Sequence, residues 1–180
     1  MSSAEPLLMT VEQYRELPER EDVIQELHWG QVVNLARPKM GHVKLRYRLI
    51  TLVGREAESF GVVGSGMGFR ALSKYELRAA DVAFVSQERW DTADEDDNLY
   101  GSPELVIEIL SPSNTKAEMR EKAALFLSTG AEEFWIVDPN RKTVTVMRRQ
   151  GSALIYEMGN RIPLNLFGGD LAVAEIFEAV

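Results

Sequence analysis

The stretch from residue 104 to residue 137 constrains the fold more than any other part of the sequence. It begins with ELVIEIL at 104–110, an apolar run typical of a strand that is buried on both faces. Pro112 ends that strand, a helix is predicted from about Thr115 to Thr129, and EFWIV at 133–137 predicts a second strand. This order predicts two parallel strands joined by a crossover helix, and hence a sheet covered by helices.

The rest of the chain predicts further strands and helices around this unit. The longest is an amphipathic helix over 42–60, in which Leu45, Leu49 and Val53 fall on one apolar arc. We therefore expect an α/β fold with a mixed central sheet flanked by helices. The other predicted elements are a short helix that begins at Thr10 and ends at Pro18, a hairpin over 24–35 with its turn at Trp29 and Gly30, strands at 62–72 and 78–86 joined around Ser73 and Lys74, an acidic loop at 91–97, strands at 143–149 and 153–157, and a short helix from about residue 172.

Size and composition fit one globular domain over residues 1–180. The longest apolar runs are shorter than the about 20 residues of a membrane span. The N-terminus also lacks the basic start and apolar stretch of a secretory signal. We expect a cytoplasmic protein without membrane contact. The chain has no cysteine, which agrees with that compartment and excludes disulfides, thiolate zinc sites and cysteine nucleophiles.

The net charge of −8 argues against broad, nonspecific binding to nucleic acid. Proteins that bind nucleic acid in this way carry a basic surface. Any contact with DNA would therefore need a local basic patch or a bridging metal ion. The acidic segment at 91–97 is expected to be a solvated loop, and it would repel DNA if it bordered a site.

Two carboxylates stand at positions where a charge is conspicuous. Glu108 interrupts the apolar run at 104–110, where an ionised carboxylate is costly unless a cation, a salt bridge or a raised pKa compensates. The plainer alternative is a glutamate at a partly solvated strand end. Strand alternation places Asp81 on one face with Ala83 and Val85. Here the alternative is a strand-edge aspartate that accepts hydrogen bonds from backbone amides.

Lys122 is predicted to lie on the sheet-facing side of the crossover helix, because Met119 and Phe126 are its neighbours at helical spacing. The alternative is a lysine whose stem crosses the apolar face and whose ammonium reaches solvent. Since the crossover returns Lys122 to the sheet near Glu108, we expect one site. Two carboxylates on adjacent strands suit Mg²⁺ or Mn²⁺, and a lysine beside them can orient water or stabilise phosphate charge.

Further polar residues are candidates for the border of this site. Glu26 lies in the predicted hairpin, and His42 falls in the middle of the apolar arc of the long helix, where a histidine is more often a hydrogen-bonded core or capping residue. Lys44, Arg48 and Arg55 form a stripe on the opposite side of that helix. The stripe can contact phosphates, although a solvated helix face has the same pattern.

Several short motifs follow one another along residues 9–178. They are MTVEQY at 9–14, ELHWGQVV at 26–33, GFR at 68–70, ADVAFVSQERW at 80–90, PELVIEILSPSNT at 103–115, EKAALFLSTGAEEFWIVDP at 121–139 and LAVAEIF at 171–177. No motif is specific alone, but in this order and spacing the chain resembles the bacterial "putative restriction endonuclease" family, a branch of the PD-(D/E)XK nuclease-like superfamily.

The resemblance implies a restriction endonuclease-like core with a metal-dependent site. It implies that Asp81 is the aspartate of the family's Pro-Asp strand, with Ala80 in place of the proline, and that Glu108 is the glutamate of the next strand. The superfamily pattern has a lysine two positions after that glutamate, where this chain has Leu110. Lys122 matches a lysine that such family members supply from the following helix.

The resemblance also implies that Glu26 and His42 border the cleft.

Two functional hypotheses follow. The first is a Mg²⁺- or Mn²⁺-dependent endonuclease that hydrolyses phosphodiester bonds in DNA. In it Asp81 and Glu108 hold the metal, with help from Glu26, and Lys122 positions the water. The second is a non-catalytic or regulatory nuclease-fold domain that binds a protein or nucleic-acid partner, favoured by the net charge and the displaced lysine. A homodimer is expected, because two-fold dimers are common and two sites could cut two strands.

Overall fold

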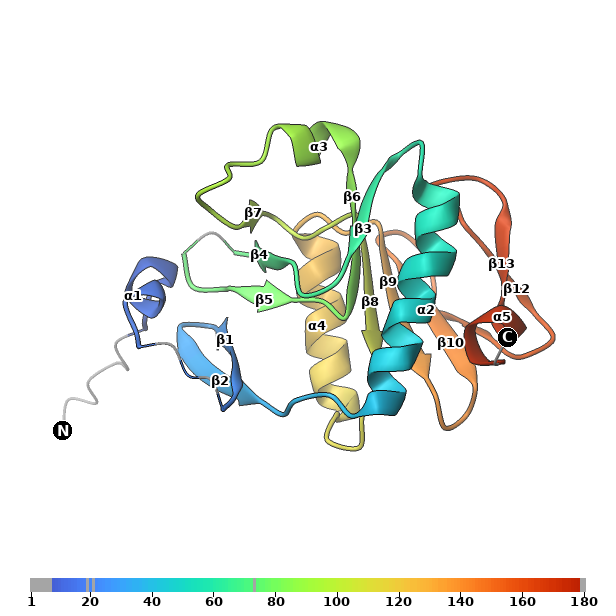
Figure 1. The fold of residues 1–180 in the computed structure, drawn as a ribbon, viewed down its shortest axis with the longest axis horizontal. Helices are drawn as coiled ribbons and strands as arrows, with labels where there is room; N and C mark the ends of the chain where they lie inside the picture. Colours follow the sequence, from blue (N-terminus) through green and yellow to red (C-terminus); the bar gives the residue numbers. More distant parts are fainter. Residues whose placement is uncertain (1–7, 19, 21, 73, 179–180) are drawn as a thin grey trace.

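The computed structural model describes residues 8–18, 20, 22–72 and 74–178. Its main feature is a six-stranded mixed sheet. The strands are β3 (Gly61–Gly64), β6 (Val82–Ser86), β8 (Leu105–Ile109), β9 (Glu133–Asp138), β10 (Thr143–Arg148) and β11 (Leu154–Tyr156). Their order across the sheet is β11-β10-β9-β8-β6-β3 (Figure 1). The predicted mixed sheet is confirmed.

The centre of the sheet is the predicted strand–helix–strand unit. β8 and β9 are parallel, and α4 (Lys116–Ser128) connects them. The helix begins after Thr115, which forms a capping box with Glu118, so the local sequence determines where it starts. On its other edge β8 pairs with antiparallel β6, with Val82 opposite Ile107. β8 is thus flanked by strands on both edges and buried along its whole length.

Helices cover both faces of the sheet, and alternate residues of β8 face different layers. Ile107 packs in one core cluster with Leu49 of α2 (Met40–Ala57), whereas Val106 packs in the other with Phe126 of α4. The sheet is therefore enclosed between α2 and α4 (Figure 1). This arrangement explains why 104–110 lacks the polar alternation of a half-exposed strand.

The C-terminal segment closes the α2 side of the core. It contains the hairpin β12 (Arg161–Pro163) and β13 (Asp170–Ala172), followed by α5 (Val173–Phe177). Ile162 and Ile176 from these elements are fully buried in the same cluster as α2. The predicted short helix near 172 is confirmed, but the hairpin was not predicted.

A second group of elements lies at one end of the molecule (Figure 1). It consists of α1 (Val11–Arg15), the hairpin β1 (Ile24–His28) and β2 (Gln31–Leu35), and a three-stranded sheet of β4 (Gly68–Arg70), β5 (Arg78–Ala79) and β7 (Leu99–Tyr100). Reciprocal backbone hydrogen bonds between Leu27 and Leu77 join the hairpin to the segment just before β5. The hairpin is thereby held beside the strand that leads into β6.

The two long strands predicted at 62–72 and 78–86 are wrong as continuous strands. The first divides into β3 and β4 and the second into β5 and β6, and in each case the two pieces belong to different sheets. Gly66 has a φ of +66°, which turns the chain between β3 and β4. Ser73, in the predicted turn between the two strands, lies outside the described residues.

The division of the second strand also changes the surroundings of Asp81. Ala80 and Ala83 belong to the same core cluster, although strict alternation would place them on opposite faces. Asp81 lies in a bend between β5 and β6. The prediction that side chains alternate regularly between the two faces through Asp81 is therefore wrong. The direction of the Asp81 side chain is set by the bend and not by a continuous strand.

Two other boundaries differ from prediction. The long helix ends at Ala57, so Phe60 lies outside it and is 45% exposed. The acidic segment at 91–97 follows a short helix, α3 (Gln87–Asp91), and is not wholly solvated, because Asp97 forms ion pairs with Arg15 and Arg70. These contacts attach the segment to α1 and β4. No helix among the described residues has the length and hydropathy needed to cross a bilayer.

Candidate functional site

Asp81 lies where the ladder between β6 and β8 ends. Its Oδ2 accepts a hydrogen bond of 2.9 Å from the amide of Ile109, the last residue of β8. Its Oδ1 lies 2.7 Å from Nε2 of His42, in the first turn of α2. The carboxylate thus accepts the hydrogen bond that a backbone carbonyl would accept if the ladder continued. It also joins the central sheet to the start of α2.

Glu108 precedes Ile109 and is only 7% exposed. Its Oε2 accepts a hydrogen bond of 2.8 Å from Nζ of Lys122, whereas its Oε1 is buried and has no hydrogen-bond partner among the described residues. Burial raises the pKa of Glu108 to about 7, with Asp81 adding to the rise and the Lys122 ammonium opposing it. A carboxylate with this pKa changes its charge near neutral pH.

Lys122 reaches Glu108 from α4, where its neighbour Met119 is buried as predicted. Burial by itself lowers the pKa of Lys122, but the negative charges of Glu108 and Glu26 and the hydrogen bond to Glu108 outweigh it, so the pKa is raised. Lys122 therefore keeps its proton at neutral pH. It supplies a buried cation to the site and is unsuited to act as a base.

Glu26 of β1 approaches the same site from the hairpin and is also buried, at 4% exposure. Its Oε2 lies 2.6 Å from Nε2 of His28, and its Oε1 accepts a hydrogen bond of 3.1 Å from the amide of Ala79. Burial alone would raise the pKa of Glu26, but the His28 contact, the Lys122 charge and the Ala79 amide more than offset it, and the pKa is lowered. Glu26 stays ionised.

The charges of these side chains change one another's pKa values. The charges of Lys122, Asp81 and Glu26 all act on Glu108. The three carboxylates come from β1, the β5–β6 bend and β8, and the ammonium comes from α4. Residues far apart in sequence thus form one charged cluster at the junction of the central sheet and the N-terminal elements.

Two carboxylates of this cluster have the chemistry of ligands for a divalent ion. The described residues contain no group of three or more His, Asp or Glu side chains arranged to hold a metal by themselves. However, the buried Oε1 of Glu108 is an acceptor without a donor, a state that is costly and that a cation relieves. Mg²⁺ is commonly held by one or two carboxylates and keeps several waters. Asp81 and Glu108 can therefore supply the protein ligands for an ion of this class.

Two residues of the basic stripe of α2, Arg48 and Arg55, are engaged by other parts of the structure. Arg48 donates hydrogen bonds to the carbonyls of Ile176 and Glu178, at the C-terminal end of α5, and Arg55 pairs with Glu56 and Glu175. Lys44 is exposed on the same helix. Arg48 thus binds the C-terminal segment, and its position does not favour phosphate contact.

Arg46 is a residue that the sequence reasoning missed. It lies one helical turn after His42, so the two side chains lie on the same side of α2. Its Nε is buried and has no hydrogen-bond partner among the described residues. Most arginines of the structure form ion pairs, so a buried Nε without an acceptor, one turn from His42, is notable. The i, i+4 spacing from His42 was the available signal.

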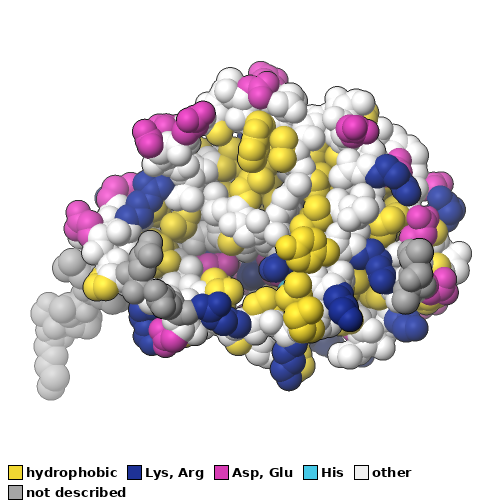
Figure 2. Space-filling model, in the orientation of Figure 1, with side chains coloured by type: hydrophobic (Ala, Val, Ile, Leu, Met, Phe, Trp, Pro, Cys, Tyr) yellow, Lys and Arg dark blue, Asp and Glu magenta, His cyan; other side chains and the backbone are white. Residues whose placement is uncertain are grey.

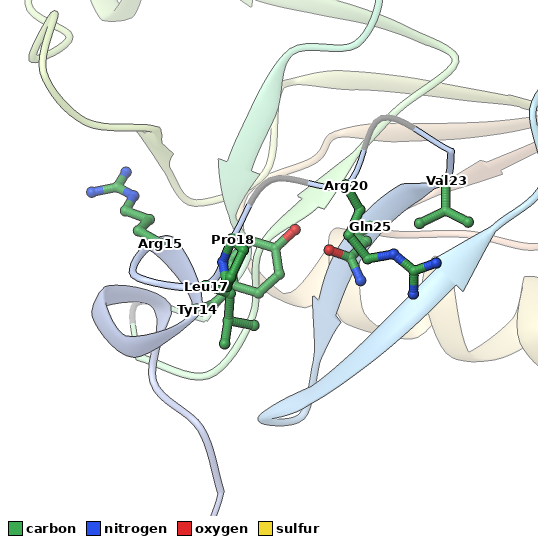
Figure 3. Close-up of a pocket in the computed structure, with 7 residues that line it drawn as sticks. All are labelled: Tyr14, Arg15, Leu17, Pro18, Arg20, Val23 and Gln25. Atoms are coloured by element: carbon green, nitrogen blue, oxygen red, sulfur yellow. The ribbon is translucent and has the colours of Figure 1, made fainter.

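Figure 2 shows a recess on this face of the molecule, between α2 and the strands β4 and β5, with basic and acidic side chains on its floor. The junction of β5 and β6, which carries Asp81, lies at the same place in Figure 1. A different hollow, of about 390 Å³, is lined by α1, β1 and the residues between them, including Tyr14, Arg15 and Gln25 (Figure 3). None of the charged cluster lines that hollow.

Comparison with known proteins finds similarity in both sequence and structure. The model of a protein family described as "Putative restriction endonuclease" matches residues 11–174. A crystal structure of a protein from Anabaena variabilis ATCC 29413, described as "a putative nuclease", is similar with a TM-score of 0.80 at 19% sequence identity, over 94% of this chain and 97% of that chain. At this identity the likeness shows the fold alone. No curated protein matches the sequence.

Proposed function

Since the chain belongs to the family described as "Putative restriction endonuclease", we propose that it hydrolyses phosphodiester bonds in DNA with a Mg²⁺ or Mn²⁺ ion held by Asp81 and Glu108. One observation carries the proposal: Oε1 of Glu108 is buried without a donor, while Lys122 and Asp81 lie beside it. A purely structural glutamate would be expected to have both oxygens satisfied.

Lys122 replaces the lysine that the superfamily pattern puts at position 110. It contacts Glu108 directly and its raised pKa keeps it charged. A fixed ammonium beside a reacting phosphate would stabilise negative charge that develops on the phosphoryl oxygens, and it would orient a water through its remaining N–H groups. The displaced lysine is therefore compatible with activity.

His42 and Arg46 would act on the α2 side of the site. His42 orients the carboxylate of Asp81 through the contact at Oδ1, while the Ile109 amide holds Oδ2. Arg46 would bind a phosphate oxygen, because a guanidinium matches phosphate geometry and the described residues offer its Nε no acceptor. Glu26, with a hydrogen bond at each oxygen, would hold Lys122 by its charge and so act on the metal site indirectly, without being a metal ligand.

When bound, the metal ion would supply positive charge to the phosphate oxygen and lower the pKa of a coordinated water. The test is cleavage of supercoiled plasmid and of circular single-stranded DNA with Mg²⁺, Mn²⁺ or EDTA. We expect metal-dependent nicking that Asp81→Asn and Glu108→Gln abolish. Isothermal titration calorimetry with Mn²⁺ should show binding that both substitutions remove.

Glu132→Gln is the matched control, since Glu132 is an exposed carboxylate paired with Arg149 on the surface. It should leave both cleavage and Mn²⁺ binding unchanged. Absence of nicking with every divalent metal, together with Mn²⁺ binding that ignores Asp81 and Glu108, would overturn the proposal. That result would favour the non-catalytic, partner-binding domain.

A further inference from the structure

Trp29 stands at the tip of the β1–β2 hairpin and is 50% exposed. Its φ is +49°, a left-handed conformation that is unfavourable for a residue other than glycine, and Gly30 follows with a φ of +70°. A Cβ at Gly30 would approach Cβ of Leu8 to 2.7 Å, so the turn is also packed closely against the segment before α1. The fold thus holds a large aromatic ring at the surface in a strained turn.

The ring is fixed by a closed set of hydrogen bonds. The indole Nε1 of Trp29 donates to Oε1 of Glu121 at 3.0 Å, and its amide donates to Oε1 of Glu76 at 2.7 Å. Arg78 joins these two acceptors, because it donates to Oε2 of Glu76 at 2.6 Å and to Oε1 of Glu121 at 3.0 Å. Glu76 and Arg78 are almost fully buried. An aromatic ring fixed in this way loses little freedom when it binds a ligand.

The fixed indole is connected to the charged cluster through Glu121 and Arg78, and the charge of Arg78 acts on Lys122. Glu121 directly precedes Lys122 in α4, and the strand that leads to Trp29 carries Glu26. We therefore expect a ligand that contacts Lys122 to reach the exposed indole as well. The ring is placed to bind a part of the substrate next to the reacting phosphate.

The charge of the chain indicates which part of the substrate this is. With a net charge of −8, the protein has little general attraction for the phosphate backbone. Stacking of a base on an aromatic ring depends little on the net charge of the protein and raises affinity by about 5- to 150-fold per base. Bases in the interior of a duplex already stack on a neighbour on each side, so away from duplex ends only an unpaired nucleotide can offer its face to the indole.

We propose that Trp29 is a stacking platform for an unpaired nucleobase, and that the site therefore takes single-stranded DNA or an unpaired DNA end. This inference rests on the proposed nuclease function and gives it a substrate class. Stacking on Trp29 and contact of the adjacent phosphate with the Lys122 cluster together would set the register of the strand.

The test is fluorescence anisotropy with a fluorescein-labelled 15-nucleotide dT strand and a 15-base-pair duplex, in Ca²⁺, with gels to check that the probes stay intact. Trp29→Ala should weaken binding of the single strand about tenfold, since about 1.4 kcal/mol corresponds to a factor of ten. Trp29→Phe should stay within about threefold of the wild type because its ring still stacks. No Trp29 variant should change duplex binding.

Trp90→Ala is the matched control, because Trp90 is 45% exposed but lies on α3. It should bind both probes like the wild type. If Trp29→Ala does not fold, fluorescence quenching gives the same answer. In Trp90→Phe, the dT strand should quench the emission of Trp29, and that quenching should disappear in Trp90→Phe/Trp29→Phe, because the remaining Trp135 is fully buried.

Three results would overturn the inference: no binding of the dT strand by the wild type, equal affinity of the wild type and Trp29→Ala, or equal loss on strand and duplex. A change in self-association on sedimentation without a change in oligonucleotide affinity would assign the ring to a protein interface and also overturn it. Cleavage separates this inference from the proposed function. Metal-dependent cleavage that is unchanged by substitution of Trp29 would support the nuclease function and contradict the stacking role. Trp29-dependent binding of the dT strand without cleavage would support the stacking role and contradict the nuclease function.

Discussion

Glu26 and Glu108 are both buried glutamates on which the charge of Lys122 acts, yet their environments differ in hydrogen bonding and in neighbouring charge. Glu26, on the hairpin side, has a hydrogen bond at each carboxylate oxygen, and its pKa is lowered. Glu108, on the central sheet, has a hydrogen bond at one oxygen only, and its pKa is raised to about 7. Both glutamates are buried, so the hydrogen-bond donors and the charges beside each carboxylate decide whether it remains charged.

The difference separates two functions for similar residues. Glu26 is satisfied by protein groups and so contributes a permanent negative charge that holds Lys122 in place. Glu108 retains an unused acceptor, which leaves capacity for an external cation. The comparison predicts that substitution of the two glutamates reduces activity to different extents, and that their contributions to stability depend on pH with opposite signs.

The largest expected contrast is in catalysis. Glu108→Gln should abolish metal-dependent cleavage, while Glu26→Gln should reduce it about 10- to 100-fold, as expected for a residue that acts on the site through others. Initial rates of plasmid nicking across a Mn²⁺ series measure both. Equal losses in the two variants would show that Glu26 is a direct metal ligand and would remove the distinction.

Removal of the shared cation should affect stability most strongly through Glu108. Lys122→Met leaves that carboxylate buried and unpaired, and at pH 8 it should lower the free energy of unfolding by about 3–5 kcal/mol. Urea denaturation followed by circular dichroism gives the value. The double variant Lys122→Met/Glu108→Gln should recover much of the loss, because no unpaired charge remains; a double variant no more stable than the single one contradicts the assignment.

The pH dependence of stability should have opposite signs at the two glutamates. Between its ordinary pKa of 4.5 and its folded value of about 7, Glu108 binds a proton in the folded state that the unfolded chain has lost. Its contribution therefore falls as pH rises through this range, by about 3 kcal/mol at about 1.4 kcal/mol per pKa unit. The lowered pKa of Glu26 stabilises the fold above 4.5, and this contribution is lost as pH falls through the folded value.

Unfolding of the wild type and of Glu108→Gln at pH 5, 6, 7 and 8 isolates the first effect, because the other titrating groups cancel in the difference. The free energy of unfolding of Glu108→Gln should rise relative to that of the wild type as pH rises, and this change should be complete above about pH 7. Parallel curves for the two proteins would show that Glu108 has an ordinary pKa in the folded state.

The smallest expected effect is at His28, which contacts Glu26 alone among the charged cluster. His28→Ala removes one of two hydrogen-bond partners and should cost about 1–2 kcal/mol at pH 7, with the pKa of Glu26 raised toward its ordinary value. Thermal unfolding at pH 5 and pH 7 measures the loss. His28→Gln retains an amide donor and should recover part of it.

The central fold could be predicted from the sequence because its signals are local. The apolar run of β8, the capping box at Thr115 and the apolar start of β9 each identify an element without reference to the rest of the chain. The breaks at Gly66 and Asp81, where each predicted strand divides in two, could not be predicted in this way. They arise because one half of each predicted strand pairs in a second sheet. The β12–β13 hairpin has three residues in each strand, too few to show a period.

The site was partly predictable for a related reason. Asp81, Glu108 and Lys122 could be nominated because a charge in an apolar element is visible in sequence. Which oxygen of each carboxylate is satisfied depends on groups brought in by the fold, such as the amide of Ala79 at Glu26. Arg46 was missed because the sequence does not show which side of α2 faces the site. The contact between His42 and Asp81 in the first turn of α2 identifies that side.

The hydrogen bond from the Ile109 amide to Asp81 gives the site an internal spectroscopic probe. A proton shared with a carboxylate resonates at low field, and its ¹H and ¹⁵N shifts change when charge is drawn from the acceptor. In a ¹⁵N-labelled sample the Ile109 cross-peak should therefore move during a Mg²⁺ titration, and its amide should exchange slowly with deuterated solvent. A single backbone resonance can thus report occupancy of the site without substrate, turnover or any substitution of the chain.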